Sequence, residues 1–144
     1  MQVKYKVNDT YATYETSIKK TQISDEELSV QLSVAICDAV YITECMDSTA
    51  NAVIALQNTL PENVKIICCQ SCIHGNFCAV GNYDDEIFCL SDIEVKTIDD
   101  MLQPTEDHEE RSKRSRTLLY VCDMYQEITD DKFSYNDWMF LATE

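Results

Sequence analysis

Val64-Lys65-Ile66-Ile67-Cys68-Cys69-Gln70-Ser71-Cys72 is the stretch of this 144-residue chain from which most of the fold is inferred. It joins a short apolar run, which predicts a buried strand, to a Cys-x-x-Cys pair. Five of the eight cysteines lie between positions 68 and 89, and the two glycines, Gly75 and Gly81, lie in the same interval. This combination is typical of a structural metal site.

The spacing of Cys69 and Cys72 is that of zinc ligands. Zinc prefers four thiolate or imidazole ligands, and two of them often come from one Cys-x-x-Cys turn. If residues 64–69 pair as a hairpin with residues 86–90, Cys89 returns near the base of this turn. The sequence therefore predicts three zinc ligands in one strand–loop–strand unit.

The fourth ligand has three candidates. Cys122 is favoured, because it lies on a predicted helix that it would tie to the hairpin, while Cys78 and His74 are its rivals. The predicted structural zinc site consists of Cys69, Cys72, Cys89 and Cys122.

The other cysteines are predicted to be structural. Side chains alternate along a strand, so Cys68 points away from Cys69 and into the core. Cys37 and Cys45 are interpreted as small buried hydrophobes. A thiol-redox site would place a helix directly after Cys72, but Ile73-His74-Gly75 is a poor helix start.

Upstream of the cysteines the pattern favours strands. Alternation in residues 2–20, with turn chemistry at Asn8-Asp9-Thr10, predicts a hairpin. Strict alternation from Leu28 to Ile36 predicts another strand, although Ser24 and Glu27 form a capping box that would begin a helix. Strand or helix therefore stays open for residues 28–46.

Two main helices are predicted. Asp47 or Ser48 caps the first, which runs to about Leu60 and is stopped by Pro61. The second begins at Pro104-Thr105, with acidic residues near its start and an apolar stripe that extends to Tyr125. We expect one α+β domain over residues 1–144: an antiparallel sheet, two main helices packed on one face, and a cysteine-rich β-hairpin.

The charge of the chain limits its partners. The net charge is −15, from 26 acidic and 11 basic side chains. This opposes binding to nucleic acid and to an anionic membrane surface, and it favours a basic protein partner. Residues 84–110 are the most acidic stretch. No apolar run reaches the roughly 18 residues of a membrane span, and no signal peptide is visible, so a cytoplasmic protein is expected.

The run Leu60-Pro61, Val64-Lys65-Ile66, Cys69-x-x-Cys72, Gly81 and Phe88-Cys89 resembles a family of small, uncharacterised bacterial proteins. That family has a Cys-x-x-Cys, a glycine loop and a later Cys-Phe, whereas the order here is Phe-Cys. The resemblance implies no activity, and it implies that Cys69, Cys72, Cys89 and Cys122 belong together.

Two functions are compatible with these features. The first is a small acidic binding protein, such as an immunity protein that neutralises a basic toxin, with residues 84–110 as its contact surface. The alternative is a metal-dependent or thiol-redox enzyme that uses the Cys-x-x-Cys site. The sequence shows no acid–base set for catalysis, so we expect a binding protein rather than an enzyme.

Overall fold

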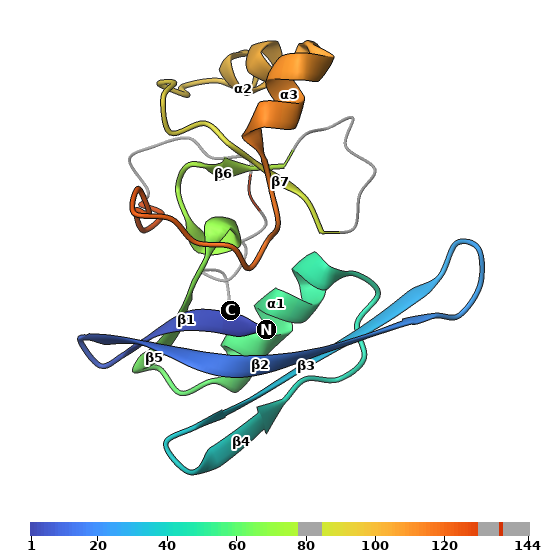
Figure 1. The fold of residues 1–144 in the computed structure, drawn as a ribbon, viewed down its shortest axis with the longest axis vertical. Helices are drawn as coiled ribbons and strands as arrows, with labels where there is room; N and C mark the ends of the chain where they lie inside the picture. The colour runs from blue at the N-terminus through green and yellow to red at the C-terminus, as the bar shows by residue number, and fades with distance from the viewer. Residues whose placement is uncertain (78–84, 130–135, 137–144) are drawn as a thin grey trace. The chain divides into compact units, whose positions relative to one another are not determined.

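The computed structural model describes residues 1–77, 85–129 and 136. The chain forms two compact units, Met1–Ile67 and Cys68–Glu144 (Figure 1). The first contains an antiparallel sheet and a helix, and the second contains a small sheet and short helices, which confirms the α+β class. The single domain over residues 1–144 stays a prediction.

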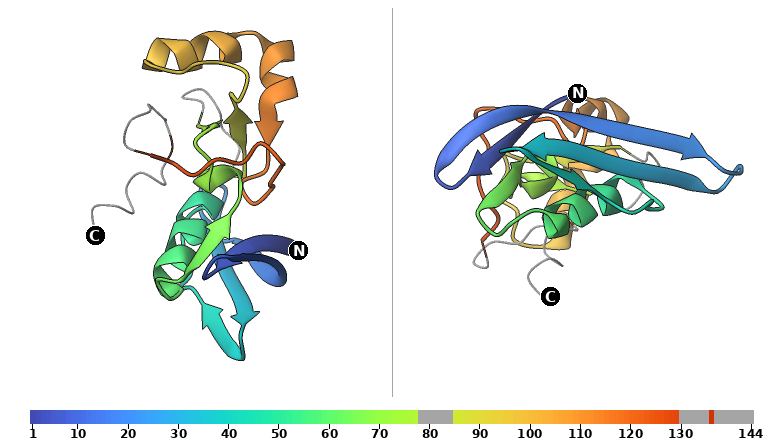
Figure 2. Two further views of the ribbon diagram at one scale, coloured as in Figure 1. Left: turned by 90° about the vertical axis from the view of Figure 1, so that its left-hand side faces the viewer. Right: turned by 90° about the horizontal axis from the view of Figure 1, so that it is seen from below.

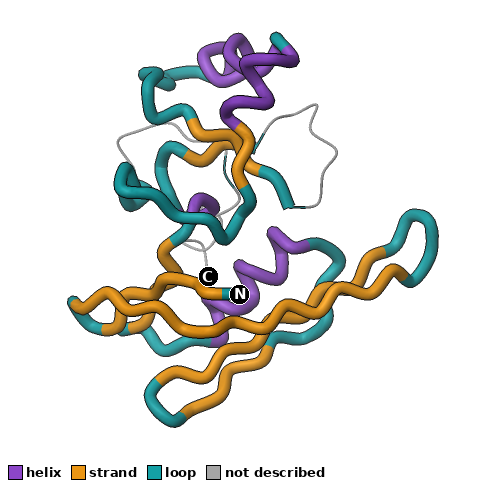
Figure 3. The backbone as a smooth tube through the Cα atoms, viewed as in Figure 1, coloured by secondary structure: helices purple, strands orange, loops and turns teal. Residues whose placement is uncertain are grey.

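The first unit is a five-stranded antiparallel sheet with one helix. The strands lie in the order β4-β3-β2-β1-β5, labelled in Figure 1 and drawn in orange in Figure 3. The elements are β1 (Gln2–Val7), β2 (Thr10–Gln22), β3 (Leu28–Ile36), β4 (Ala39–Ile42), α1 (Thr49–Thr59) and β5 (Val64–Ile67).

The predicted first hairpin is confirmed. β1 and β2 are joined by a tight turn at Asn8, whose positive φ of 56° is a conformation that asparagine tolerates well. The long strand β2 then pairs through residues 16–22 with β3. One strand therefore links the β1 ladder to the β3 ladder.

Residues 28–36 form a strand, so the alternation was the better guide. Ser24 does accept a hydrogen bond from the Glu27 backbone N–H, at 3.1 Å, but this bond closes the turn between β2 and β3 instead of beginning a helix. The alternating side chains of β3 are buried, among them Leu32, which is fully enclosed.

The first predicted helix is also confirmed. Ser48 caps α1 by accepting a hydrogen bond from the Asn51 backbone N–H, and Pro61 follows the last turn. Figure 2 shows α1 lying along one face of the sheet, where Val53 and Leu56 are fully buried. On the same side, the buried Tyr5 hydroxyl and Thr16 Oγ1 are hydrogen-bonded at 2.6 Å.

The second unit holds shorter elements. Its three-stranded sheet has the order β6-β7-β8. The elements are the 3₁₀ turn η1 (Cys69–Ser71), β6 (Gly75–Asn76), β7 (Ile87–Cys89), α2 (Ile98–Glu106), α3 (His108–Arg114) and β8 (Ser115–Arg116).

The predicted pairing of residues 64–69 with 86–90 is wrong. β5 pairs with β1, and β7 pairs instead with β6 and β8. A cysteine-rich antiparallel pair does form, between β6 and β7. The apolar run at 64–67 fits the buried edge of the larger sheet, which an apolar pattern alone cannot distinguish from a local hairpin.

The single long helix expected from Pro104 onward is also wrong. Pro104 lies inside α2, which Thr97 begins with a capping box. Asp107 separates α2 from α3 by accepting a hydrogen bond from the Glu110 N–H at 3.2 Å. The helix cannot continue past 114, because Ser115 and the next residue pair with β7.

Candidate metal centre

The Cys-x-x-Cys segment is a tight 3₁₀ turn. The Cys72 N–H donates to the Cys69 carbonyl at 3.2 Å, so the two cysteines lie within one turn of chain. The turn is held by Ser71, whose hydroxyl accepts from the Cys68 N–H at 3.0 Å and is also hydrogen-bonded to the Tyr125 hydroxyl at 3.2 Å. This network fixes the backbone from which Cys69 and Cys72 project.

Backbone hydrogen bonds bring the segment around Cys122 to this turn. The Cys69 N–H donates to the Tyr120 carbonyl at 2.6 Å, and the Ile73 N–H donates to the Gln126 carbonyl at 2.8 Å. These two bonds bracket residue 122. Cys122 therefore reaches the site from a non-helical loop, not from a helix as predicted, because the carbonyls of Tyr120 and Gln126 accept from the turn and not from a following helical residue.

Cys89 arrives through the small sheet. Gly75 of β6 is the register partner of Cys89 in β7. The Leu90 N–H donates to the His74 carbonyl at 2.9 Å and extends this pairing. The strand pair thus sets Cys89 beside the Cys-x-x-Cys turn, although the pairing differs from the predicted one.

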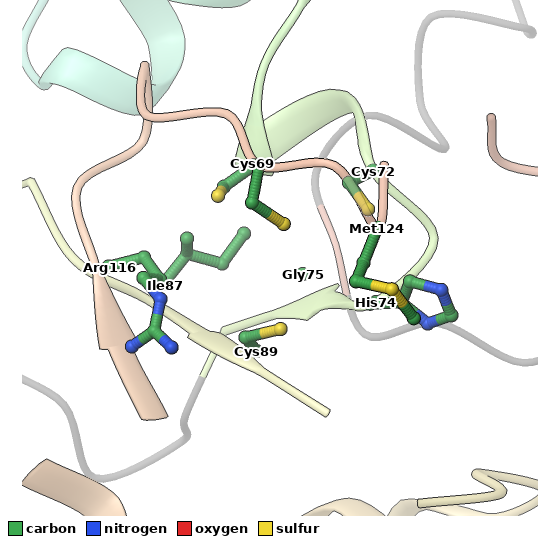
Figure 4. Close-up of a pocket in the computed structure, with 9 residues that line it drawn as sticks. Cys69, Cys72, His74, Gly75, Ile87, Cys89, Arg116 and Met124 are labelled. Carbon is green, nitrogen blue, oxygen red and sulfur yellow. The ribbon is translucent and has the colours of Figure 1, made fainter. Parts of the chain in front are cut away.

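All four predicted zinc ligands line one small cavity. Its volume is about 10 Å³, which is room for one water molecule or a small ion. Figure 4 shows the sulfur atoms of Cys69, Cys72 and Cys89 directed toward a common space. The residues that line the cavity are Cys69, Cys72, His74, Gly75, Ile87, Cys89, Arg116, Cys122 and Met124.

The donor chemistry of this cavity suits zinc, because four thiols are the ligands of a structural zinc site. Within residues 1–77, 85–129 and 136, however, no three His, Cys, Asp or Glu side chains already form a group that could hold a metal ion. Zinc lies about 2.3 Å from each thiolate, so binding would require the side chains to close in. The zinc site stays a prediction.

Burial raises the pKa of two thiols in this site, those of Cys69 and Cys72. Desolvation, followed by the neighbouring Cys68 and Cys72 thiols, raises the pKa of Cys69 to about 12. Desolvation likewise raises the pKa of Cys72, with smaller contributions from Cys89 and Cys122. Without a cation these two thiols are neutral at neutral pH, because burial and repulsion between neighbouring thiolates both disfavour the charged form.

The structure places the other histidine and cysteine candidates differently. His74 lines the cavity and so remains a rival fourth ligand, whereas Cys78 lies outside the described residues. Cys68 is fully buried, as predicted. The prediction of burial was wrong for Cys37 and Cys45, which are both exposed. Cys37 sits in the tight β3–β4 turn, where the strand alternation ends.

Sequence reasoning missed two side chains at this cavity. Met124 and Arg116 line it, and neither was among the candidate residues. Figure 4 shows the Met124 thioether beside His74 at the Cys72 side of the cavity. No spacing rule would have indicated either residue, because Arg116 is placed by the pairing of β8 with β7, and Met124 by the backbone bonds between residues 118–126 and the 3₁₀ turn.

The acidic helices connect the two strands that border the cavity. α2 and α3 lie between β7 and β8, so residues 90–114 form one excursion from the small sheet. Arg114 links the two ends of this excursion. Its guanidinium donates two hydrogen bonds to Asp92, at 2.6 and 3.1 Å, and one to Glu110 at 2.8 Å. It also donates one to the Cys89 carbonyl at 3.1 Å. This arginine joins α3 directly to a cavity-lining residue.

We expect Arg114→Ala to destabilise the second unit by about 1–2 kcal/mol, since it removes charge-assisted hydrogen bonds from a nearly buried side chain with exposed partners. The hydrogen bond from Arg114 lowers the pKa of Asp92. The stability difference should therefore be complete above about pH 4 and shrink as the pH falls through the lowered pKa. Chemical unfolding measures it, with the exposed Lys113→Ala as control. Equal effects of both variants would contradict this role.

No family model, curated protein or solved structure matches this chain. The resemblance to small bacterial proteins therefore stays a prediction. Among the described residues, no helix is both long enough and apolar enough to cross a membrane.

Proposed function

We propose that this chain is a small acidic binding protein of the immunity type, which neutralises a basic toxin in the cytoplasm. We propose further that a structural zinc ion on Cys69, Cys72, Cys89 and Cys122 stabilises its binding unit. One observation carries the proposal: the acidic helices α2 and α3 connect β7 to β8, two strands of the small sheet that borders the four-cysteine cavity.

The charge of the chain is concentrated in the second unit. Residues 68–144 carry 17 acidic and 6 basic side chains, a formal charge of −11 out of the total −15. Part of this charge serves the fold: Asp107 caps α3, and Asp100 accepts backbone N–H bonds at the start of α2. The acidic surface proposed for the partner consists of residues exposed on the two helices, Asp99, Glu106 and Glu109.

A basic partner would gain from this arrangement in two ways. Clustered negative charge speeds encounter, because it steers an oppositely charged protein toward one surface. A site that fixes Cys89 also fixes the base of the excursion, where Arg114 donates to the Cys89 carbonyl. A rigid acidic surface loses less entropy on binding than a flexible one.

The enzyme alternative gains less support from the site. A redox or nucleophilic thiol acts as the thiolate and needs a lowered pKa. Burial raises the pKa of Cys69 to about 12, in the opposite direction. The described cysteines are all free thiols, which suits a reducing compartment.

The two reading frames that flank this gene supply the test. We expect one of them to encode a basic protein that arrests growth, and we expect co-expression of this chain to restore growth. Against that protein, the triple variant Asp99→Lys, Glu106→Lys, Glu109→Lys should lower the association rate by about tenfold or more, because the steering charge is reversed. Stopped-flow measurements at two salt concentrations should show the wild-type rate falling as salt rises.

The control variant carries the same charge change in the first unit. Asp25, Glu26 and Glu44 are exposed there, and their replacement by Lys should leave the association rate much closer to the wild-type value. A salt-insensitive rate, or equal losses in the two triple variants, would contradict the proposed surface. If neither adjacent frame encodes a protein that binds this chain, the immunity function is wrong.

A further inference from the structure

Three lysines gather on the outer face of the first unit's sheet. In β1, Val3 and Tyr5 are buried, so the alternating Lys4 and Lys6 point to the opposite face. Lys65 of the edge strand β5 is the direct register partner of Lys6. We call Lys4, Lys6 and Lys65 the lysine cluster.

Like charges directly opposite each other in a sheet destabilise it. Side chains of such partners start about 4.5–5.5 Å apart, so Lys6 and Lys65 repel each other. In the part of the chain that the structure describes, none of the three lysines forms an ion pair. The nearby carboxylate of Glu15 is bound instead by the N-terminal amino group and the Gln2 amide. The cluster is therefore an uncompensated positive patch on an acidic protein.

Tyr11 holds two of these charges in one place. On β2 it is the register partner of Lys6, and the residue is 53% exposed. The ring centroid lies 4.9 Å from Lys4 Nζ and 5.8 Å from Lys6 Nζ, within the range of cation–π attraction. Two ammonium groups are thus held beside one ring, and the third belongs to the next strand.

We propose that the lysine cluster and Tyr11 bind a small dianion of the phosphate type. Lysine binds phosphate as a point charge, and a dianion would relieve the repulsion between Lys6 and Lys65. A small anion fits better than a polyanion, because the net charge of −15 repels a long chain of phosphates well beyond the cluster. This site is separate from the proposed acidic surface and does not depend on it.

Nuclear magnetic resonance titration with inorganic pyrophosphate tests the site, with ionic strength held constant by sodium chloride. We expect saturable shifts confined to the strands around Lys6, Lys65 and Tyr11. A parallel titration with O-phosphoserine distinguishes the source: tighter binding than inorganic phosphate indicates a phosphomonoester ligand, and weaker binding indicates free phosphate or pyrophosphate.

Lys65→Glu separates a binding role from a structural one. It replaces the repulsive pair by an attractive one, so it should raise the melting temperature of the anion-free protein while weakening pyrophosphate binding at least tenfold. Lys19→Glu makes the same charge change at an exposed position far along β2 and should leave binding nearly intact. If pyrophosphate produces no saturable shifts in the wild type, or both variants lose binding equally, the proposal is wrong and Lys65 only protects an edge strand from pairing.

Discussion

Protein purified from zinc-containing medium is expected to hold one zinc ion per chain, and the double variant Cys69→Ser, Cys72→Ser to hold none. Both side chains line the cavity together with Cys89 and Cys122. The metal would hold together segments that lie more than fifty residues apart in the sequence. Because structural zinc contributes folding energy directly, we expect its loss to lower the melting temperature of the second unit by about 10–20 °C.

The chain provides a matched control for this experiment. Cys37 and Cys45 are exposed and are not among the cavity-lining residues, so their double replacement by Ser should change neither metal content nor melting temperature. Metal content is measured by elemental analysis. Treatment of the wild type with a chelator should remove the zinc and lower the melting temperature as much as the Cys69→Ser, Cys72→Ser double replacement does. The zinc site would be ruled out if the purified wild type holds no metal and if neither the chelator nor the Cys69→Ser, Cys72→Ser double replacement lowers its melting temperature.

Single replacements then identify the fourth ligand. Cys122→Ser should weaken zinc binding strongly, because the backbone bonds from Cys69 and Ile73 hold residues 120–126 beside the turn. His74→Ala and Cys78→Ser should retain the metal. Loss of zinc in either of these two variants, with retention in Cys122→Ser, would reassign the ligand.

The sequence predicted the first unit well for a physical reason. Strands that bury one face must alternate, so the pattern from Leu28 to Ile36 favours a strand and indicates its buried side, although a helix stayed open for residues 28–46. The helix after Ser48 was equally predictable, because the capping residue, the apolar face and Pro61 all indicate the same helix and its ends. These features act over a few neighbouring residues and are visible without knowledge of the rest of the fold.

The second unit was predicted less well, because long-range backbone pairing decides its elements. Leu118 looks like part of a helical stripe, yet its carbonyl accepts from the Gln70 N–H at 3.1 Å and its N–H donates to Asp85 Oδ1 at 3.0 Å. Strand β5 looks like the partner of β7 but pairs with β1. The four predicted ligands nevertheless line one cavity, and their role as a zinc site stays a prediction.

Gly75→Ala is expected to destabilise the second unit by about 3 kcal/mol or more and to abolish zinc binding. A Cβ at this position would overlap the Cys69 carbonyl oxygen and lie 2.9 Å from Ile87 Cδ1. The carbonyl has little freedom to retreat, because the Cys72 N–H donates to it within the 3₁₀ turn. The methyl group would therefore push apart the turn that carries Cys69 and the strand that pairs with Cys89.

A double variant distinguishes the two clashes. Ile87→Val removes Cδ1, and with it the 2.9 Å contact, but it leaves the Cys69 carbonyl oxygen in place. If the backbone clash dominates, the Gly75→Ala, Ile87→Val protein stays as unstable as Gly75→Ala alone, within the roughly 1 kcal/mol that Ile→Val itself costs. Recovery of stability and zinc content in the double variant would show that a movable side chain, and not the 3₁₀ turn, limits the space at Gly75. Wild-type stability in Gly75→Ala itself would mean that the turn and β6 are not packed this closely, and the route by which Cys89 reaches the Cys-x-x-Cys pair would then have to be different.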